Sequence, residues 1–179
     1  MNAPTGRLLA TAAVLVLTLG ACGDDGPSQE EIMTSNTEAR TEIQRLVDEA
    51  VEVVLAATAD LEPEEVTGGI HESWSACSDA PYGPSDPPES ITWSYERWFE
   101  TPAEVDTMAL VGDLAPVFLD RGWAARQGSG TDTLRIDRFG NGDGYVLEVT
   151  GQLARGGEAP GIVVAVQSPC VPTPPDLEW

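Results

Sequence analysis

The sequence predicts an α+β protein in which two helices pack on an antiparallel sheet of about four to five strands, with one disulfide. Apolar residues recur at helical spacing in two separate segments, whereas the second half of the chain contains short apolar runs between glycine-rich turns. The order of helix, strand, helix and several further strands is typical of a sheet that carries its helices on one face. Two cysteines within this region can form the disulfide.

Residues 30–59 are predicted to form one long helix. Apolar side chains recur there at three- and four-residue steps and form a single stripe, which comprises Ile32, Ala39, Ile43, Leu46, Val47, Ala50, Val54 and Ala57. Glutamates fall between them, on the side expected to face water. Pro63 and the pair Gly68-Gly69 are expected to end the helix.

Residues 71–90 are predicted to be irregular because they are dense in serine, proline, aspartate and glycine. Trp74 and Cys77 lie inside this stretch. Such a long irregular segment needs something to hold it, and a disulfide at Cys77 meets that need. Residues 91–99 follow with alternating apolar side chains, the pattern of a β-strand.

The second helix is predicted to begin at Thr101, which serves as the N-cap. Pro102 then occupies the first helical position, and Glu104 completes a capping box. Pro116 lies inside the helical pattern and is expected to kink or split the helix. Gly122 is expected to close it.

The rest of the chain is predicted to be β-structure. Residues 122–126 fit a short strand. Residues 134–139 and 145–150 flank the turn-forming segment 140–144, which is a strong hairpin signal. Residues 162–166 are entirely apolar and are predicted to form a buried strand.

The first residues of the chain have the three parts of an export signal. Arg7 is the only basic side chain before an uncharged run at residues 8–19, and Leu19-Gly20-Ala21-Cys22 follows it. This run is too short to cross a hydrocarbon core of roughly 30 Å. Leu19-Gly20-Ala21-Cys22 resembles the lipobox of bacterial lipoproteins. The resemblance implies cleavage before Cys22 and attachment of a diacylglyceryl group, with acyl chains such as palmitate, to its thiol.

These features predict one folded domain behind a lipid anchor. Residues 1–21 form the signal peptide and residues 22–29 the lipidated tether. Residues 30–170 form a single α+β domain, and residues 171–179 a proline-rich tail. One acyl chain binds a membrane only marginally, so stable anchoring through Cys22 needs two or three chains.

The charge of the chain limits its partners. The chain has nine basic residues, all arginine, against thirty acids, and its net charge of −21 becomes −22 once Arg7 is removed with the signal peptide. Such a surface repels phosphate backbones, so no nucleic acid partner is expected. The absence of lysine excludes Schiff-base enzymes and P-loop lysines. Arginine-only usage resembles that of actinobacteria, and the whole chain resembles their small surface lipoproteins of unknown function.

The three cysteines are Cys22, Cys77 and Cys170. If lipidation takes Cys22, the other two form a pair in an oxidising compartment and close a loop of 92 intervening residues. The chain-entropy model gives such a loop roughly 4–5 kcal/mol of stabilisation. The alternative is two free thiols, with Cys77 reactive.

His71 is the only histidine, and it is the one candidate for a catalytic base, near Ser73, Ser75 or Cys77. The sequence lacks the Gly-x-Ser-x-Gly motif, and a lone His-Glu pair is not a zinc motif. His71 is therefore predicted to be a surface or loop histidine, and no catalytic residue is assigned.

No metal or cofactor is expected. A single histidine leaves too few ligands for zinc or copper. Asp137, Asn141, Asp143 and Glu148 have part of the spacing of a calcium loop, but the hairpin explains the same residues more simply. Whether a weak calcium site exists there stays open.

Trp74, Trp93 and Trp98 are the candidate ligand-binding residues. Aromatic residues in a sheet more often belong to the core. Because Trp93 and Trp98 are five residues apart, they face opposite sides of a regular strand, and one of them can be exposed.

The sequence thus predicts a non-catalytic binding or accessory domain, held by the lipid on Cys22 at the extracytoplasmic face of the cell membrane. Its expected partner is an envelope protein or a glycan. The alternative is a cell-envelope hydrolase with paired carboxylates. A deep cleft with two carboxyls about 5–9 Å apart would favour the hydrolase, and a shallow face lined by tryptophan would favour binding.

Overall fold

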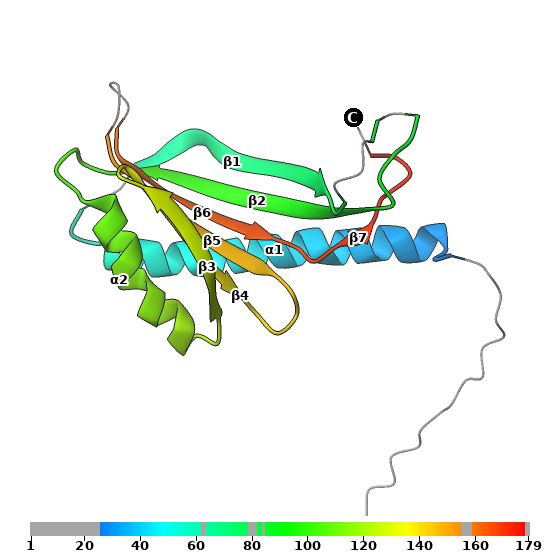
Figure 1. Cartoon of the computed structure of the whole chain (residues 1–179), viewed down its shortest axis with the longest axis horizontal. Helices are drawn as coiled ribbons and strands as arrows, with labels where there is room; N and C mark the ends of the chain where they lie inside the picture. Colours follow the sequence, from blue (N-terminus) through cyan, green and yellow to red (C-terminus); the bar gives the residue numbers. More distant parts are fainter. Residues whose placement is uncertain (1–25, 62–63, 79–81, 84, 155–158, 178–179) are drawn as a thin grey trace, which may run out of the picture.

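The computed structural model describes residues 26–61, 64–78, 82–83, 85–154 and 159–177. Within these ranges, two helices pack on one seven-stranded antiparallel sheet, which confirms the α+β prediction (Figure 1). The predicted signal peptide and the lipobox at Cys22 lie outside the described residues. Neither helix in the described ranges combines the length and the apolar character needed to cross a membrane.

The elements follow one another along the chain as α1 (Gln29–Ala57), β1 (Glu64–Ala76), β2 (Ser90–Glu100), α2 (Thr107–Asp120), β3 (Ala124–Thr131), β4 (Leu134–Gly140), β5 (Val146–Gln152), β6 (Gly161–Gln167) and β7 (Val171–Pro172). In the sheet they are ordered β1-β2-β6-β5-β4-β3, and the short β7 also pairs with β2. Helix α1 packs on β2, β6 and β7, and α2 packs on β5, β4 and β3.

Both helices cover the same face of the sheet, and the core lies between them and the strands (Figure 1). The predicted stripe of α1 is buried there, and Phe118 of α2 meets Phe139 of β4 at 5.3 Å between ring centroids. In β5, Leu147 and Val149 are fully buried whereas Glu148 between them is partly exposed. This alternation leaves the other face of the sheet open to solvent in the described part of the chain.

Helix α2 begins later than predicted. Thr101 does not cap it, because the backbone N–H of Thr101 donates to the carbonyl of Pro160 at 2.9 Å. The N-cap is Asp106, whose Oδ1 accepts the N–H of Ala109 at 3.0 Å. The capping box predicted at residues 101–104 is therefore wrong. The helix also continues through Pro116 without being split.

The sheet is larger than the sequence indicated. Residues 71–76, predicted as irregular, belong to β1 and pair in register with residues 91–96 of β2. Residues 127–131 extend β3 against β4, and residues 171–172 of the predicted tail form β7. These segments consist largely of residues with a low preference for strands, so their own sequence does not predict a strand. They become strands because a neighbouring strand supplies the hydrogen bonds.

The disulfide between Cys77 and Cys170 is present, with a Cα–Cα distance of 6.1 Å. It joins the residue after β1 to the residue before β7. The predicted pairing is therefore confirmed, and the disulfide holds β1 and the chain's last segment on either side of β2.

Candidate functional site

A pocket lies between the first turns of α1, the ends of β1 and β2, and the segment that follows β7. It encloses about 360 Å³. Its lining includes Met33, Asn36, Arg40, Trp74, Trp93 and Leu177. We call this the aromatic pocket.

The sheet register brings the two tryptophans of this pocket together. Trp74 on β1 is directly opposite Trp93 on β2, so both side chains point to the helix side of the sheet. Trp93 is largely buried, whereas Trp74 is partly exposed and its ring centroid lies 5.9 Å from that of Tyr82. The disulfide at Cys77 holds the end of β1 next to the tail that supplies Leu177.

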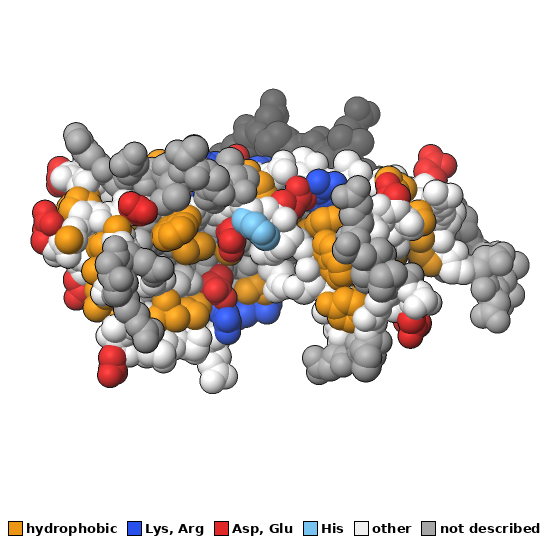
Figure 2. Space-filling view, turned by 90° about the horizontal axis from the view of Figure 1, so that it is seen from above, with side chains coloured by type: hydrophobic (Ala, Val, Ile, Leu, Met, Phe, Trp, Pro, Cys, Tyr) orange, Lys and Arg blue, Asp and Glu red, His pale blue; other side chains and the backbone are white. Residues whose placement is uncertain are grey.

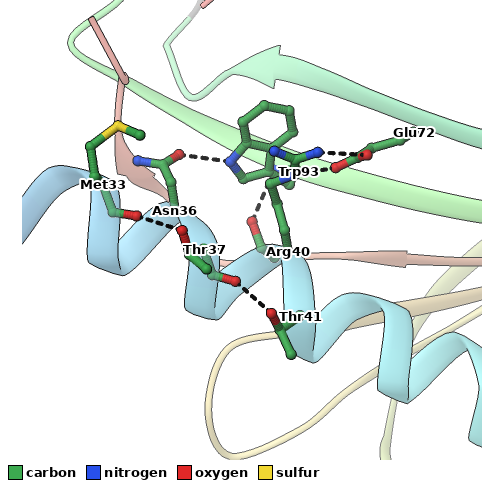
Figure 3. Close-up of polar contacts among 8 residues, drawn as sticks. Met33, Asn36, Thr37, Arg40, Thr41, Glu72 and Trp93 are labelled. Carbon is green, nitrogen blue, oxygen red and sulfur yellow. Dashed lines mark hydrogen bonds and ion pairs between the residues drawn. The ribbon is translucent and has the colours of Figure 1, made fainter. Parts of the chain in front are cut away.

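Asn36 fixes the floor of the aromatic pocket. Its side chain is 4% exposed, and its Oδ1 accepts the indole N–H of Trp93 at 2.7 Å (Figure 3). The amide nitrogen donates to the carbonyls of Ile32 at 2.8 Å and Pro172 at 2.9 Å. One buried amide thus connects α1, β2 and β7.

Arg40 supplies a cation at the edge of the pocket. Its guanidinium lies over the ring of Trp93, 4.9 Å from the centroid, and its Nη2 donates to Glu72 at 2.9 Å (Figure 3). Arg40 Nε donates to the other oxygen of the same carboxylate. The hydrogen bonds to Glu72 raise the pKa of Arg40, so the guanidinium is charged and held in place.

The structure separates the three tryptophans that the sequence singled out. Trp74 and Trp93 line the aromatic pocket, whereas Trp98 lies on the open face and is 39% exposed. The expectation that Trp93 and Trp98 face opposite sides of the strand is confirmed. Trp93 is 8% exposed, so it belongs to the buried core as well as to the lining of the pocket.

Sequence reasoning missed Asn36 and the pair Arg40–Glu72. Asn36 falls within the apolar stripe of α1, between Ile32 and Ile43, and a polar residue in such a stripe signals a buried hydrogen-bonding group. No comparable signal marks Arg40–Glu72, because their contact depends on residue 72 belonging to a strand.

The open face carries a second hollow, of about 670 Å³. Its lining includes Glu96, Arg126, Arg138, Glu148, Ala165 and Gln167, which come from five strands. We call it the charged hollow. Arg138 Nε donates to Glu148 at 2.7 Å.

His71 is exposed, as predicted for a surface histidine, but it lies on strand β1 instead of in a loop. It faces the open side, directly opposite Glu96. Figure 2 views the molecule from this side, with the histidine near the middle and acidic side chains next to it. Cys77 is in the disulfide, so the alternative of a reactive thiol at this position is wrong.

The residues considered for calcium do not converge. Asp137 is opposite Val149, and Glu148 is opposite Arg138, so the two carboxylates point to different faces of the sheet. Asn141 Oδ1 accepts the N–H of Tyr145 at 2.9 Å and closes the turn. Among the residues that the structure describes, no group of three His, Cys, Asp or Glu side chains is placed to hold a metal ion.

Comparisons with models of known protein families, with curated proteins and with solved structures find no match to this chain.

Proposed function

We propose that this protein is a lipid-anchored, non-catalytic binding module of the cell envelope, and that the aromatic pocket receives its ligand. The pocket itself is the observation that carries the proposal. Its volume of about 360 Å³ falls within the roughly 300–1,000 Å³ of small-molecule sites. Such sites combine an apolar wall with a few fixed polar groups, and this pocket has both.

The lining indicates the kind of ligand. Trp74, Met33 and Leu177 offer apolar surface, and Met33 is 40% exposed. The guanidinium of Arg40 is already hydrogen-bonded to Glu72, so this ion pair carries no net charge, and the lining also includes the carboxylate of Asp176. An apolar or aromatic group with hydrogen-bond donors at one edge, as found in a hydrophobic peptide segment or a glycoside, fits this lining.

The place of the pocket along the chain supports a role at the membrane surface. Six residues, 23–28, separate Cys22 from the first residue of helix α1, and this length of chain spans at most about 25 Å when extended. Met33 lies in the first turns of α1, so a lipid on Cys22 would hold the pocket close to the bilayer. The disulfide between Cys77 and Cys170 is consistent with an oxidising compartment outside the cytoplasm.

The anchor is tested by replacing Cys22. The variant Cys22→Ala is expected to leave the membrane fraction or to accumulate as an uncleaved precursor. Unchanged fractionation, together with an unmodified Cys22 in the wild type by mass spectrometry, would exclude the lipid anchor.

The ligand site is tested by extracting the protein in detergent and identifying the small molecules that co-purify with it. Trp74→Ala is expected to lose the bound molecule. Trp98→Ala is the matched control, because Trp98 lies on the opposite face of the sheet. Equal retention of the same molecule by both variants would contradict the assignment of the pocket.

A hydrolase with paired carboxylates is the second candidate, and one observation favours it. Glu96 and Glu148 both line the charged hollow and stand on either side of Ala165, so their Cα atoms are two strand spacings, about 10 Å, apart. Glu148 accepts a hydrogen bond from Arg138 Nε at 2.7 Å. Release of reducing ends from envelope glycans by the wild type, and its loss in Glu96→Gln, would establish this function.

A further inference from the structure

One row of charged side chains crosses the open face of the sheet. The registers of neighbouring strands align His71, Glu96, Ala165, Glu148, Arg138 and Arg126 in that order, from β1 to β3. The row is acidic on β2 and β5 and basic on β4 and β3. Most of it lines the charged hollow, and Figure 2 shows arginine and acidic side chains side by side on this face.

The basic end of the row is unusual because two arginines are directly opposite each other. Arg126 on β3 faces Arg138 on β4, and like charges at directly opposed positions destabilise a sheet. Glu148 pairs with Arg138 alone. Arg126 has no ion pair with any residue that the structure describes. Gly140 leaves room for its side chain, because a Cβ at that position would collide with Arg126 Nε.

A bound anion would relieve this repulsion, yet the protein as a whole repels anions. The net charge of −21 makes a simple anion an unfavourable ligand. A ligand that also carries a positive charge avoids this penalty. Glu96, at the other end of the charged hollow, is placed to receive that charge.

The spacing sets the length of the ligand. Glu96 and Arg138 are three strand spacings apart, or about 14–15 Å between Cα atoms. The midpoint between Arg138 and Arg126 is half a strand spacing farther from Glu96, at about 16–17 Å. An extended tripeptide spans about 10–11 Å, and a hydrogen bond of about 2.9 Å at each end brings this length to about 16–17 Å. Two residues lie between the ends: Ala165, whose side chain is small, and Glu148, which is hydrogen-bonded to Arg138.

We propose that the charged hollow binds a short zwitterionic peptide, whose carboxylate lies between Arg126 and Arg138 and whose ammonium group meets Glu96. This site is on the opposite face of the sheet from the aromatic pocket, and the inference does not depend on the ligand of that pocket.

The test is a titration of the isotope-labelled full-length protein, kept in detergent micelles, with tri-alanine, and NMR chemical shifts are the readout. Saturable shifts are expected in β2, β6, β5, β4 and β3. Tri-alanine amide, which lacks the carboxylate, and N-acetyl-tri-alanine, which lacks the ammonium, are each expected to bind at least tenfold more weakly. Inorganic phosphate is expected to bind more weakly than tri-alanine.

Variants localise the effect. Arg126→Gln is expected to raise the Kd for tri-alanine at least tenfold. The matched control Arg121→Gln, which removes the same charge at the end of α2, is expected to change it less than twofold. Trp74→Ala is expected to leave the Kd unchanged, which separates this site from the aromatic pocket.

Three results would overturn the proposal. They are the absence of saturable shifts with tri-alanine, equal weakening by Arg126→Gln and Arg121→Gln, and phosphate binding as tight as that of tri-alanine. The last result would replace the peptide with a simple anion.

Discussion

Replacing Asn36 with alanine is expected to lower the free energy of unfolding by about 2–4 kcal/mol. The substitution leaves the indole N–H of Trp93 and the carbonyl of Pro172 without their protein partner. A buried polar group left unpaired costs about 1–3 kcal/mol, so two groups cost about 2–6 kcal/mol. Asn36 lines the aromatic pocket, so water in the pocket can bond to one of these two unpaired groups. The expected loss of unfolding free energy therefore lies in the lower half of that range.

Urea unfolding followed by tryptophan fluorescence measures this change. Thr37→Ala is the matched control on the exposed side of the same helix turn, where the lost bond to the Met33 carbonyl is expected to cost about 0.5 kcal/mol or less. In a Trp93→Phe background, Asn36→Ala is expected to cost about 1–2 kcal/mol less, because no indole N–H is left unpaired. If Asn36→Ala destabilises the protein no more than Thr37→Ala, the reasoning about the buried amide is refuted.

Three further predictions concern other parts of the fold. The double variant Cys77→Ala/Cys170→Ala is expected to lower the free energy of unfolding, measured in urea, by about 2–5 kcal/mol. A change of less than about 1 kcal/mol would contradict the loop-closure argument. Gly151→Ala places a Cβ against the backbone at the start of α2 and is expected to cost about 1–3 kcal/mol, whereas Gly142→Ala, with open space around it, is expected to be neutral. Burial raises the pKa of Tyr145 above its ordinary value of 10.0, and nearby acidic side chains raise it further. The contribution of this tyrosine to stability is therefore complete below pH 10 and is lost as the pH rises through the higher folded pKa. Because Tyr145 ionises above pH 10 in the folded protein, Tyr145→Phe should remove a tyrosinate absorbance step at 295 nm in that range.

The elements that could be predicted from sequence are those whose pattern is local. Helix α1 carries its own apolar stripe, and the segment 140–144 gives the hairpin between β4 and β5 its turn. Residues 162–166 are apolar throughout and form the central strand β6. In each case the information lies within one stretch of chain, so period and turn chemistry are sufficient.

The elements that were not predicted depend on partners distant in the chain. Residues 71–76 contain weak strand formers and become β1 because β2 offers a complete ladder of hydrogen bonds. Thr101 has the chemistry of an N-cap, but its N–H is bonded to Pro160, 59 residues later in the chain. Local propensity is a weak guide where a tertiary hydrogen bond competes with it.

The candidate site shows the same division. The disulfide followed from counting cysteines, because the expected lipidation of Cys22 would leave a single pair. That Trp74 and Trp93 share a pocket required the β1–β2 register, which no periodicity supplies. The charged row on the open face depends on five such registers at once, and no sequence pattern marks it.

Strand β2 serves both faces of the sheet, so its register is the common determinant of the two sites. Trp93 points toward α1 and the aromatic pocket, whereas Ser94 and Glu96 point into the charged hollow. Because side chains alternate with a period of two, a slip of one residue would exchange the two sets. The Cys77–Cys170 bond and the hydrogen bond from Asn36 to the carbonyl of Pro172 hold β1 and β7 on either side of this strand. A loss of ligand at both sites in the disulfide-free variant would therefore trace to the register of β2, since neither cysteine lines either pocket.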